Sequence, residues 1–188
     1  EQSGQIREVG VELYQEMLAE AVQMAKLGGG AAADIVMDQD WVPQINLGVP
    51  VLIPEDYVHD LPVRLGLYRR LASLTEYGAI ENFAIELIDR FGPLPDEVKN
   101  LLDVMTIKQM CKRAGVEKID AGPKGGIITF RRNTFSAVDS LLVYINKQLG
   151  TVKIRPDQKL SILRNWDDVA HRVSGVRQVI TDLNDMVA

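Results

Sequence analysis

Two pairs of short alternating segments in the second half of the chain narrow the possible folds more than any other feature. The first pair covers residues 118–121 and 126–131, and the second covers residues 152–155 and 160–164. Each pair is joined by a short turn that contains glycine or proline. Connections this short join antiparallel strands, because parallel strands need a long crossover. Hairpins separated from helices along the chain predict an α+β fold rather than a doubly wound parallel sheet.

Most of the remaining chain has the apolar spacing of amphipathic helices. We expect helices at 9–27, at about 60–74, at 75–91 with Thr75 as the N-cap, at 96–114, at 138–149 and at 169–187. One further strand is expected at 41–47, and Pro43 should place it at a sheet edge because proline has no N–H to donate. The overall expectation is small antiparallel hairpins packed with several helices, preceded by one separate helix.

A glycine run predicts the domain organisation. Gly28, Gly29 and Gly30 precede three alanines, and three consecutive glycines end a helix and leave a flexible joint. We therefore expect a helix at 1–27 that belongs to a preceding part of the protein, a Gly/Ala-rich linker at 28–37 and a separate domain at 38–188. The chain starts with Glu1 rather than methionine, which favours a piece of a longer protein.

Composition excludes several classes of function. The chain of 188 residues has 21 Lys and Arg against 26 Asp and Glu, a net charge of −5, which disfavours a dedicated nucleic-acid binder. No apolar run reaches the roughly 20 residues of a membrane span. Nothing resembles a signal peptide, so a cytoplasmic location is expected. One cysteine, Cys111, allows neither an internal disulfide nor a cysteine-rich zinc site.

The sequence offers few candidates for catalysis. His59 and His171 lie more than a hundred positions apart, and Cys111 falls on an apolar helical stripe, as a buried structural thiol does. The glycine-containing turn near residue 124 lacks the pattern of a phosphate-binding loop. We therefore expect no catalytic, cofactor-binding or metal-binding residue in this chain.

An acidic pair is the more specific surface feature. Glu86 and Asp89 fall on the side of the 75–91 helix away from its apolar stripe of Ile80, Phe83 and Leu87. A solvated acidic face is one interpretation. The other is a docking patch for an arginine-rich partner, since paired carboxylates suit guanidinium groups.

A basic cluster provides the competing hypothesis. Arg64, Arg69 and Arg70 lie close together in the sequence, on the expected 60–74 helix. They are either solvated side chains or a patch that binds nucleic acid. No aromatic residues are interleaved at the spacing that single-strand stacking requires.

The segment Glu86-Leu-Ile-Asp-Arg-Phe-Gly-Pro-Leu-Pro95, preceded by Tyr68-Arg-Arg-Leu-Ala72, resembles the C-terminal domain of the bacterial transcription-repair coupling factors (the Mfd family). The segments Ile53-Pro54…Tyr57 and Lys124-Gly-Gly-Ile127 are also similar to that family. Upstream, Gly10-Val-Glu-Leu-Tyr14 resembles the end of the family's translocase motor, which is shared with the helicase RecG. The resemblance covers nearly the whole chain.

The resemblance implies a parent protein that is an ATP-dependent translocase on double-stranded DNA, with ATP and Mg²⁺ in its motor. The parent would displace stalled RNA polymerase and recruit UvrA for nucleotide excision repair. Residues 1–27 would be the C-terminal end of the motor. This chain has no Walker motif, so it would be a non-enzymatic fragment without a cofactor.

The resemblance also implies a regulatory role. The C-terminal domain would fold back on an N-terminal UvrB-like module and mask its UvrA-binding surface. Glu86 and Asp89 would face basic residues of that module. Two alternatives stay open: an accessory nucleic-acid module that uses Arg64, Arg69 and Arg70, and a self-association domain.

Overall fold

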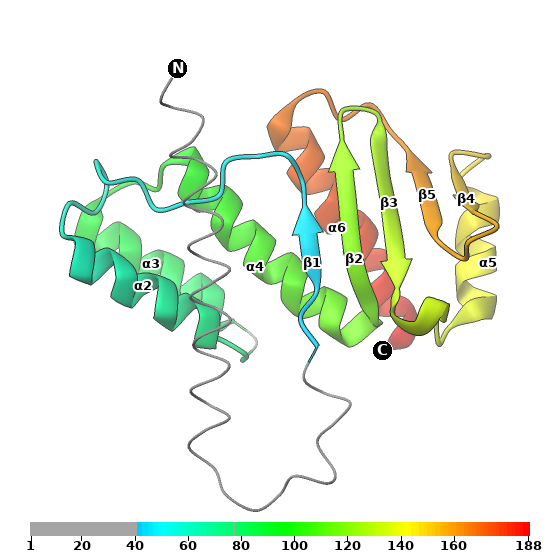
Figure 1. Ribbon diagram of the computed structural model, residues 1–188, viewed down its shortest axis with the longest axis horizontal. Helices are drawn as coiled ribbons and strands as arrows, with labels where there is room; N and C mark the ends of the chain where they lie inside the picture. The colour runs from blue at the N-terminus through cyan, green and yellow to red at the C-terminus, as the bar shows by residue number, and fades with distance from the viewer. Residues whose placement is uncertain (1–40, 77) are drawn as a thin grey trace, which may run out of the picture. The chain divides into compact units, whose positions relative to one another are not determined.

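The computed structural model describes residues 41–76 and 78–188, which form two compact units (Figure 1). Within the described residues, unit 1 combines Trp41 with Pro50–Met105, and unit 2 combines Val42–Val49 with Thr106–Ala188. The helix expected at 9–27 and the domain boundaries expected at 27/28 and 37/38 lie outside the described residues.

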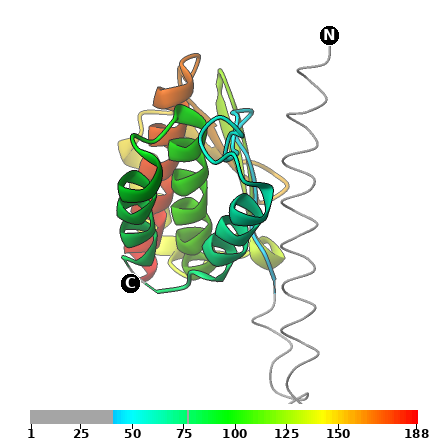
Figure 2. The same ribbon diagram turned by 90° about the vertical axis from the view of Figure 1, so that its left-hand side faces the viewer.

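Unit 1 is built from helices α2 (Leu61–Ser73) and α3 (Ala79–Phe91) and the first part of α4 (Asp96–Ala114), which are coloured teal to green in Figure 2. Helix α2 begins where its sequence favours a start. The Asp60 carboxylate accepts a hydrogen bond of 3.0 Å from the backbone N–H of Val63, and a proline follows in the first turn. The helix expected at 60–74 is confirmed.

Helix α3 begins later than expected. Gly78, not Thr75, is the N-cap, and its φ of 80° lies in the left-handed region that glycine adopts without a steric penalty. The expectation for Thr75 is wrong because this backbone conformation, rather than a side-chain cap, sets the start. The helix ends at Gly92 as expected, where the Gly92 N–H donates to the carbonyl of Ile88 at 2.9 Å.

The core of unit 1 joins these helices to the loop before α2. Its buried members are Ile53, Val58, Leu67, Leu71, Ile80, Phe83, Leu87, Val98, Leu101, Leu102 and Met105. Two tyrosines fasten the loop at the margin of this core. The Tyr57 hydroxyl donates to the carbonyls of Leu87 and Gly92, and the Tyr68 hydroxyl accepts the N–H of Ile53.

Unit 2 contains one five-stranded sheet in the order β1-β2-β3-β5-β4. Its strands are β1 (Gln44–Asn46), β2 (Val116–Gly122), β3 (Gly125–Phe130), β4 (Val152–Ile154) and β5 (Leu160–Leu163). Both expected hairpins are present as antiparallel pairs, β2 with β3 and β4 with β5. They join through an antiparallel β3–β5 pair, so the hairpins form one sheet rather than separate small ones.

Strand β1 lies at the sheet edge, as Pro43 predicts, and it pairs in parallel with β2. Arg172 holds the residues that directly follow β1. This buried side chain donates from Nη1 to the carbonyl of Leu47 at 2.9 Å and from Nε to the carbonyl of Trp166 at 3.1 Å. The parallel strand is thus held to the last helix as well as to its neighbour.

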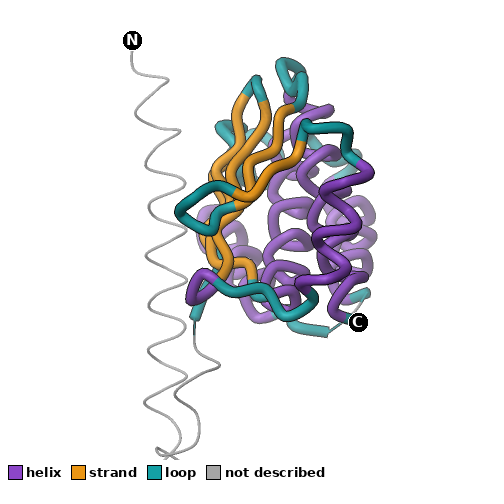
Figure 3. Tube along the Cα trace, turned by 90° about the vertical axis from the view of Figure 1, so that its right-hand side faces the viewer, coloured by secondary structure: helices purple, strands orange, loops and turns teal. Residues whose placement is uncertain are grey.

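The helices of unit 2 lie on one face of the sheet (Figure 3). They are α5 (Val138–Lys147), α6 (Val169–Val187) and the second part of α4, with a 3₁₀ turn η1 at Arg131–Asn133. Helix α6 starts at Asp168, whose carboxylate accepts the N–H of His171 at 2.9 Å. Gly175 makes room for the Trp166 indole, since a Cβ there would meet Nε1 at 2.3 Å.

The α+β class is confirmed: the described residues form five α-helices and one five-stranded mixed sheet. Every helix within the described ranges is too short or too polar to cross a membrane.

Candidate protein-docking surface on helix α3

Helix α3 places the two acidic candidates differently. Its buried stripe is Ile80, Phe83 and Leu87, as expected from the sequence. Asp89 is exposed, whereas the Glu86 side chain is only 34% exposed. The two carboxylates therefore lie in different surroundings, although they are only three residues apart.

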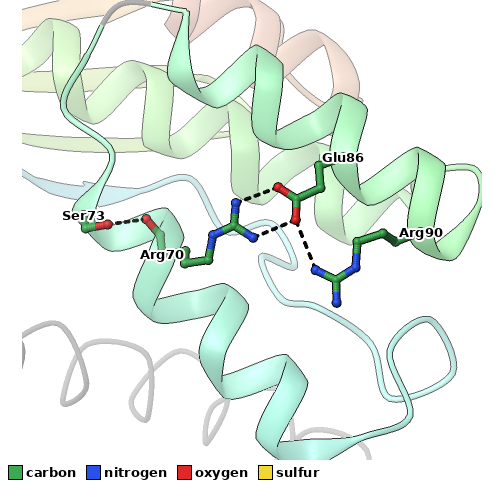
Figure 4. A network of polar contacts seen from close by, with 4 residues as sticks. All are labelled: Arg70, Ser73, Glu86 and Arg90. Carbon is green, nitrogen blue, oxygen red and sulfur yellow. Dashed lines mark hydrogen bonds and ion pairs between the residues drawn. The ribbon is translucent and has the colours of Figure 1, made fainter.

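The carboxylate of Glu86 lies between two arginines (Figure 4). Arg70 on α2 donates from Nη1 to Oε1 at 2.7 Å and from Nη2 to Oε2 at 2.6 Å. Arg90, one turn further along α3, donates from Nη1 to Oε1 at 3.1 Å. Bidentate pairs of this kind combine charge attraction with a fixed geometry. Glu86 therefore bridges α2 and α3.

These hydrogen bonds change the acidity of Glu86. The bond from Arg70 is the largest cause, followed in the same direction by the bond from Arg90, and together they lower the pKa of Glu86 from 4.5 to about 2. Partial exclusion from water opposes this shift. The bond to Glu86 also raises the pKa of Arg70. The group is at the surface, so dissolved salt will weaken the pairing.

Aromatic rings hold both guanidinium groups in place. The Cζ atom of Arg70 lies 5.2 Å from the centre of the Phe83 ring, and that of Arg90 lies 4.9 Å from the Phe91 ring. Cation–π contacts at these distances favour the observed orientations. Two arginines and one glutamate carry a net charge of +1, so this trio is not an acidic patch by itself.

The structure does not gather the three candidate arginines into one free surface. Arg64 is half-buried and donates to the carbonyl of Val58 at 2.8 Å, and Arg70 is paired with Glu86. Arg69 is exposed. A phosphate-binding role for this cluster would have to break existing contacts of two of its members.

Asp89 is the acidic candidate that is accessible to a partner. It is exposed, and within the described residues it makes no ion pair or side-chain hydrogen bond. Reasoning from the sequence missed the two arginines that neutralise Glu86. The contact with Arg90 could have been found from the i, i+4 spacing, but Arg70 lies on another helix and gives no local signal.

Other possible chemistry is limited in the described residues. Cys111 is buried, as expected, and burial raises the pKa of its thiol to about 12, which keeps it protonated and unreactive near neutral pH. No group of His, Cys, Asp or Glu side chains in residues 41–76 and 78–188 has an arrangement that could hold a metal ion.

Comparisons with known proteins agree with the resemblance noted in the sequence. The model of the TRCF domain family matches residues 47–141. The chain is 40% identical over 187 residues to the transcription-repair-coupling factor of Rickettsia prowazekii, covering 100% of this chain and 15% of that protein. It is 31% identical to the transcription-repair-coupling factor of Escherichia coli over 98% of this chain and 16% of the relative.

The fold also has a solved counterpart. The crystal structure of the C-terminal domain of a transcription-repair coupling factor superposes with a TM-score of 0.64, covering 78% of this chain and 94% of that one at 18% identity. The chain thus spans about 15% of the length of the full relatives and nearly all of that domain. The family match over half of the chain confirms the resemblance, and the chain belongs to the TRCF domain family.

Proposed function

We propose that this chain is the autoinhibitory C-terminal domain of a transcription-repair coupling factor. It docks on the UvrB-like N-terminal module of the same protein and masks the UvrA-binding surface of that module. The parent is an ATP-dependent translocase on double-stranded DNA that displaces stalled RNA polymerase in the cytoplasm. ATP and Mg²⁺ belong to its motor, and this fragment needs neither.

The observation that carries the proposal is the accessible carboxylate of Asp89. It lies on the exposed side of α3, within the segment that most resembles the family. A carboxylate that has no counter-ion among the described residues favours a basic partner, and it loses no pair with those residues when the partner binds. Membership of the TRCF domain family supports the identity of the parent protein.

Glu86 contributes to docking indirectly, through contacts within the domain. Its bonds to Arg70 and Arg90 fix α3 against α2, so it holds the docking surface in position. Its carboxylate is already shared by two guanidinium groups, and a third cation from a partner gains less there than at Asp89. The two acidic residues are therefore expected to differ in their contributions to docking.

The proposal is tested by charge reversal in the parent protein. Asp89→Lys should weaken docking, expose the UvrA-binding surface and raise UvrA affinity by about tenfold, which corresponds to one broken interface pair of about 1.4 kcal/mol. Asp56→Lys is the matched control, because it reverses an exposed carboxylate in the same unit. Equal UvrA affinity of wild type and Asp89→Lys, measured by calorimetry, would contradict the proposal.

A further inference from the structure

Charge is divided unevenly between the two units. The described part of unit 1 has 5 Lys and Arg against 10 Asp and Glu, a formal net charge of −5. Unit 2 has 14 Lys and Arg against 8 Asp and Glu, a formal net charge of +6. Dissolved salt at 0.1 M screens exposed charges beyond about 10 Å, so a partner responds to the surface near it rather than to the charge of the whole chain. Unit 2 is therefore basic by itself, although the whole chain is acidic.

The surplus of positive charge in unit 2 belongs to its sheet. Residues 115–133 and 151–164, which contain β2 to β5 and η1, have 8 Lys and Arg against 3 Asp and Glu. The rest of unit 2, which is mostly helical, has 6 against 5. Two of the three acidic side chains on the sheet are paired: Asp120 lies 3.4 Å from Nζ of Lys118, and Asp157 lies 3.2 Å from Nη2 of Arg155.

The pairing register shows which side chains share one face of the sheet. Ile119 and Ile128 are paired and buried, so they point toward the helices, which lie on that face in Figure 3. Because side chains alternate along a strand, the opposite face carries the polar residues Gln44, Lys118, Asp120, Thr129, Lys153 and Ser161. Arg155 and Lys159 continue the alternation at the end of the β4–β5 hairpin. We call Lys118, Lys153, Arg155 and Lys159 the basic face; all four are exposed or partly exposed.

We propose that the basic face binds the phosphate backbone of double-stranded nucleic acid without reading its sequence. This contact goes beyond the proposed function, because it uses the sheet of unit 2 rather than helix α3 of unit 1. The lysine and arginine side chains pair with phosphate oxygens, and the neutral side chains of Gln44, Thr129 and Ser161 add hydrogen bonds. Contacts of these kinds position a protein on a duplex but carry no base-specific information.

The width and the composition of the face select a duplex. Five strands about 4.8 Å apart form a face about 19 Å wide, and a duplex carries one negative charge per about 1.7 Å of its axis, so the face meets several phosphates at once. Proteins hold single strands largely by stacking bases on aromatic side chains. Every aromatic residue that the structure describes in unit 2 is buried or half-buried, which disfavours a single strand.

The test measures binding of the 188-residue chain to a short fluorescent DNA duplex by anisotropy at several salt concentrations. Lys153→Gln with Lys159→Gln should weaken binding at 0.1 M salt by about tenfold. It should also lower the slope of log K against log salt by about 2, because each phosphate contact contributes about 0.9. The matched control, Lys112→Gln with Lys147→Gln, removes the same charge from exposed positions on α4 and α5 and should bind as wild type does. Thermal unfolding checks that both variants fold.

Three outcomes would overturn the proposal without affecting docking through α3. The first is no binding of the duplex by the wild-type chain at low salt. The second is equal weakening in the two double variants, since the net charge of the chain would then matter rather than the basic face. The third is tighter binding of a single strand, or of a polyglutamate peptide, than of the duplex, which would assign the basic face to a different partner.

Discussion

The guanidinium of Arg70 and the carboxylate of Glu86 form a two-bond ion pair that connects α2 to α3. The pair gives Glu86 a role inside the domain, whereas Asp89, three residues later, remains exposed. A double charge reversal of these residues would therefore change two different properties at once. Single substitutions separate the support of α3 from the contact with a partner.

Removing Arg70 should make Glu86 a stronger base. In Arg70→Met the two shortest hydrogen bonds to the carboxylate are lost, so the pKa of Glu86 should rise from about 2 toward 4.5. Arg90→Met should cause a smaller rise, because its bond is the weaker of the two causes. A pH titration followed by NMR at the Glu86 carboxyl carbon measures both. An equal rise in the pKa of Glu86 in the two variants would contradict the assignment of Arg70 as the larger cause of its low value.

The same pair should make the stability of the domain depend on pH. The pKa of Glu86 is lower in the folded state than in the unfolded chain, so its ionisation stabilises the fold above about pH 4.5. This contribution is lost as the pH falls from about 4.5 to about 2. Denaturation at several pH values should show a smaller loss of stability over this range for Arg70→Met than for wild type. Added salt should reduce the difference, because the pair is at the surface.

Reversing Glu86 should destabilise the fold more than reversing Asp89. Glu86→Lys loses the bonds from both arginines and places a third positive charge beside them, which should lower the free energy of unfolding by about 1 kcal/mol. Asp89→Lys breaks no ion pair among residues 41–76 and 78–188, and it should stay within about 0.5 kcal/mol of wild type. Urea denaturation measures the free energy of unfolding of both variants. A larger loss of stability in Asp89→Lys than in Glu86→Lys would mean that Asp89 has a structural role.

Shortening a side chain on the buried face of α4 should destabilise the domain. Leu102 is 7% exposed in the core of unit 1, and Leu102→Ala removes buried surface and leaves a cavity, at a cost of about 2–5 kcal/mol. Leu142→Ala on the surface of α5 is the matched control and should cost less than about 0.5 kcal/mol. A loss below about 1 kcal/mol for Leu102→Ala would show that this face of α4 is wrongly assigned.

Arg172 should determine how firmly β1 is held. Arg172→Met leaves the buried carbonyls of Leu47 and Trp166 without their donor, which should cost about 1–3 kcal/mol. Hydrogen exchange should show the greatest loss of protection at Gln44–Asn46. Arg155→Met, which removes an exposed pair with Asp157, should cost less than about 1 kcal/mol and leave β1 protected.

Local patterns in the sequence predicted most of the secondary structure. The stripe of Val173, Val176 and Ile180 belongs to α6, and the turn after Gly122 belongs to the β2–β3 hairpin, both near the expected positions. Periodicity and turn residues act over a few positions, so they are visible in a single segment. The late start of α3 was missed because it depends on the left-handed backbone of Gly78 rather than on a capping side chain.

Features that depend on distant residues could not be predicted in this way. Strand β1 pairs with β2 across more than seventy positions, and the direction of that pair is set by the fold rather than by its three residues. The bond from Arg70 to Glu86 likewise joins two helices. Asp89 was correctly placed on an exposed face, since a helical wheel needs only the positions within one helix.

The order of the two units along the chain has a mechanical consequence. Strand β1 belongs to unit 2 and precedes the Pro50–Met105 segment of unit 1, so that segment is joined to unit 2 at both of its ends. Tension applied to the chain directly before β1 is resisted there by the pairing with β2 and by Arg172. Helix α3 lies beyond that point in the chain. The force therefore reaches the helix that carries Asp89 only after β1 has detached.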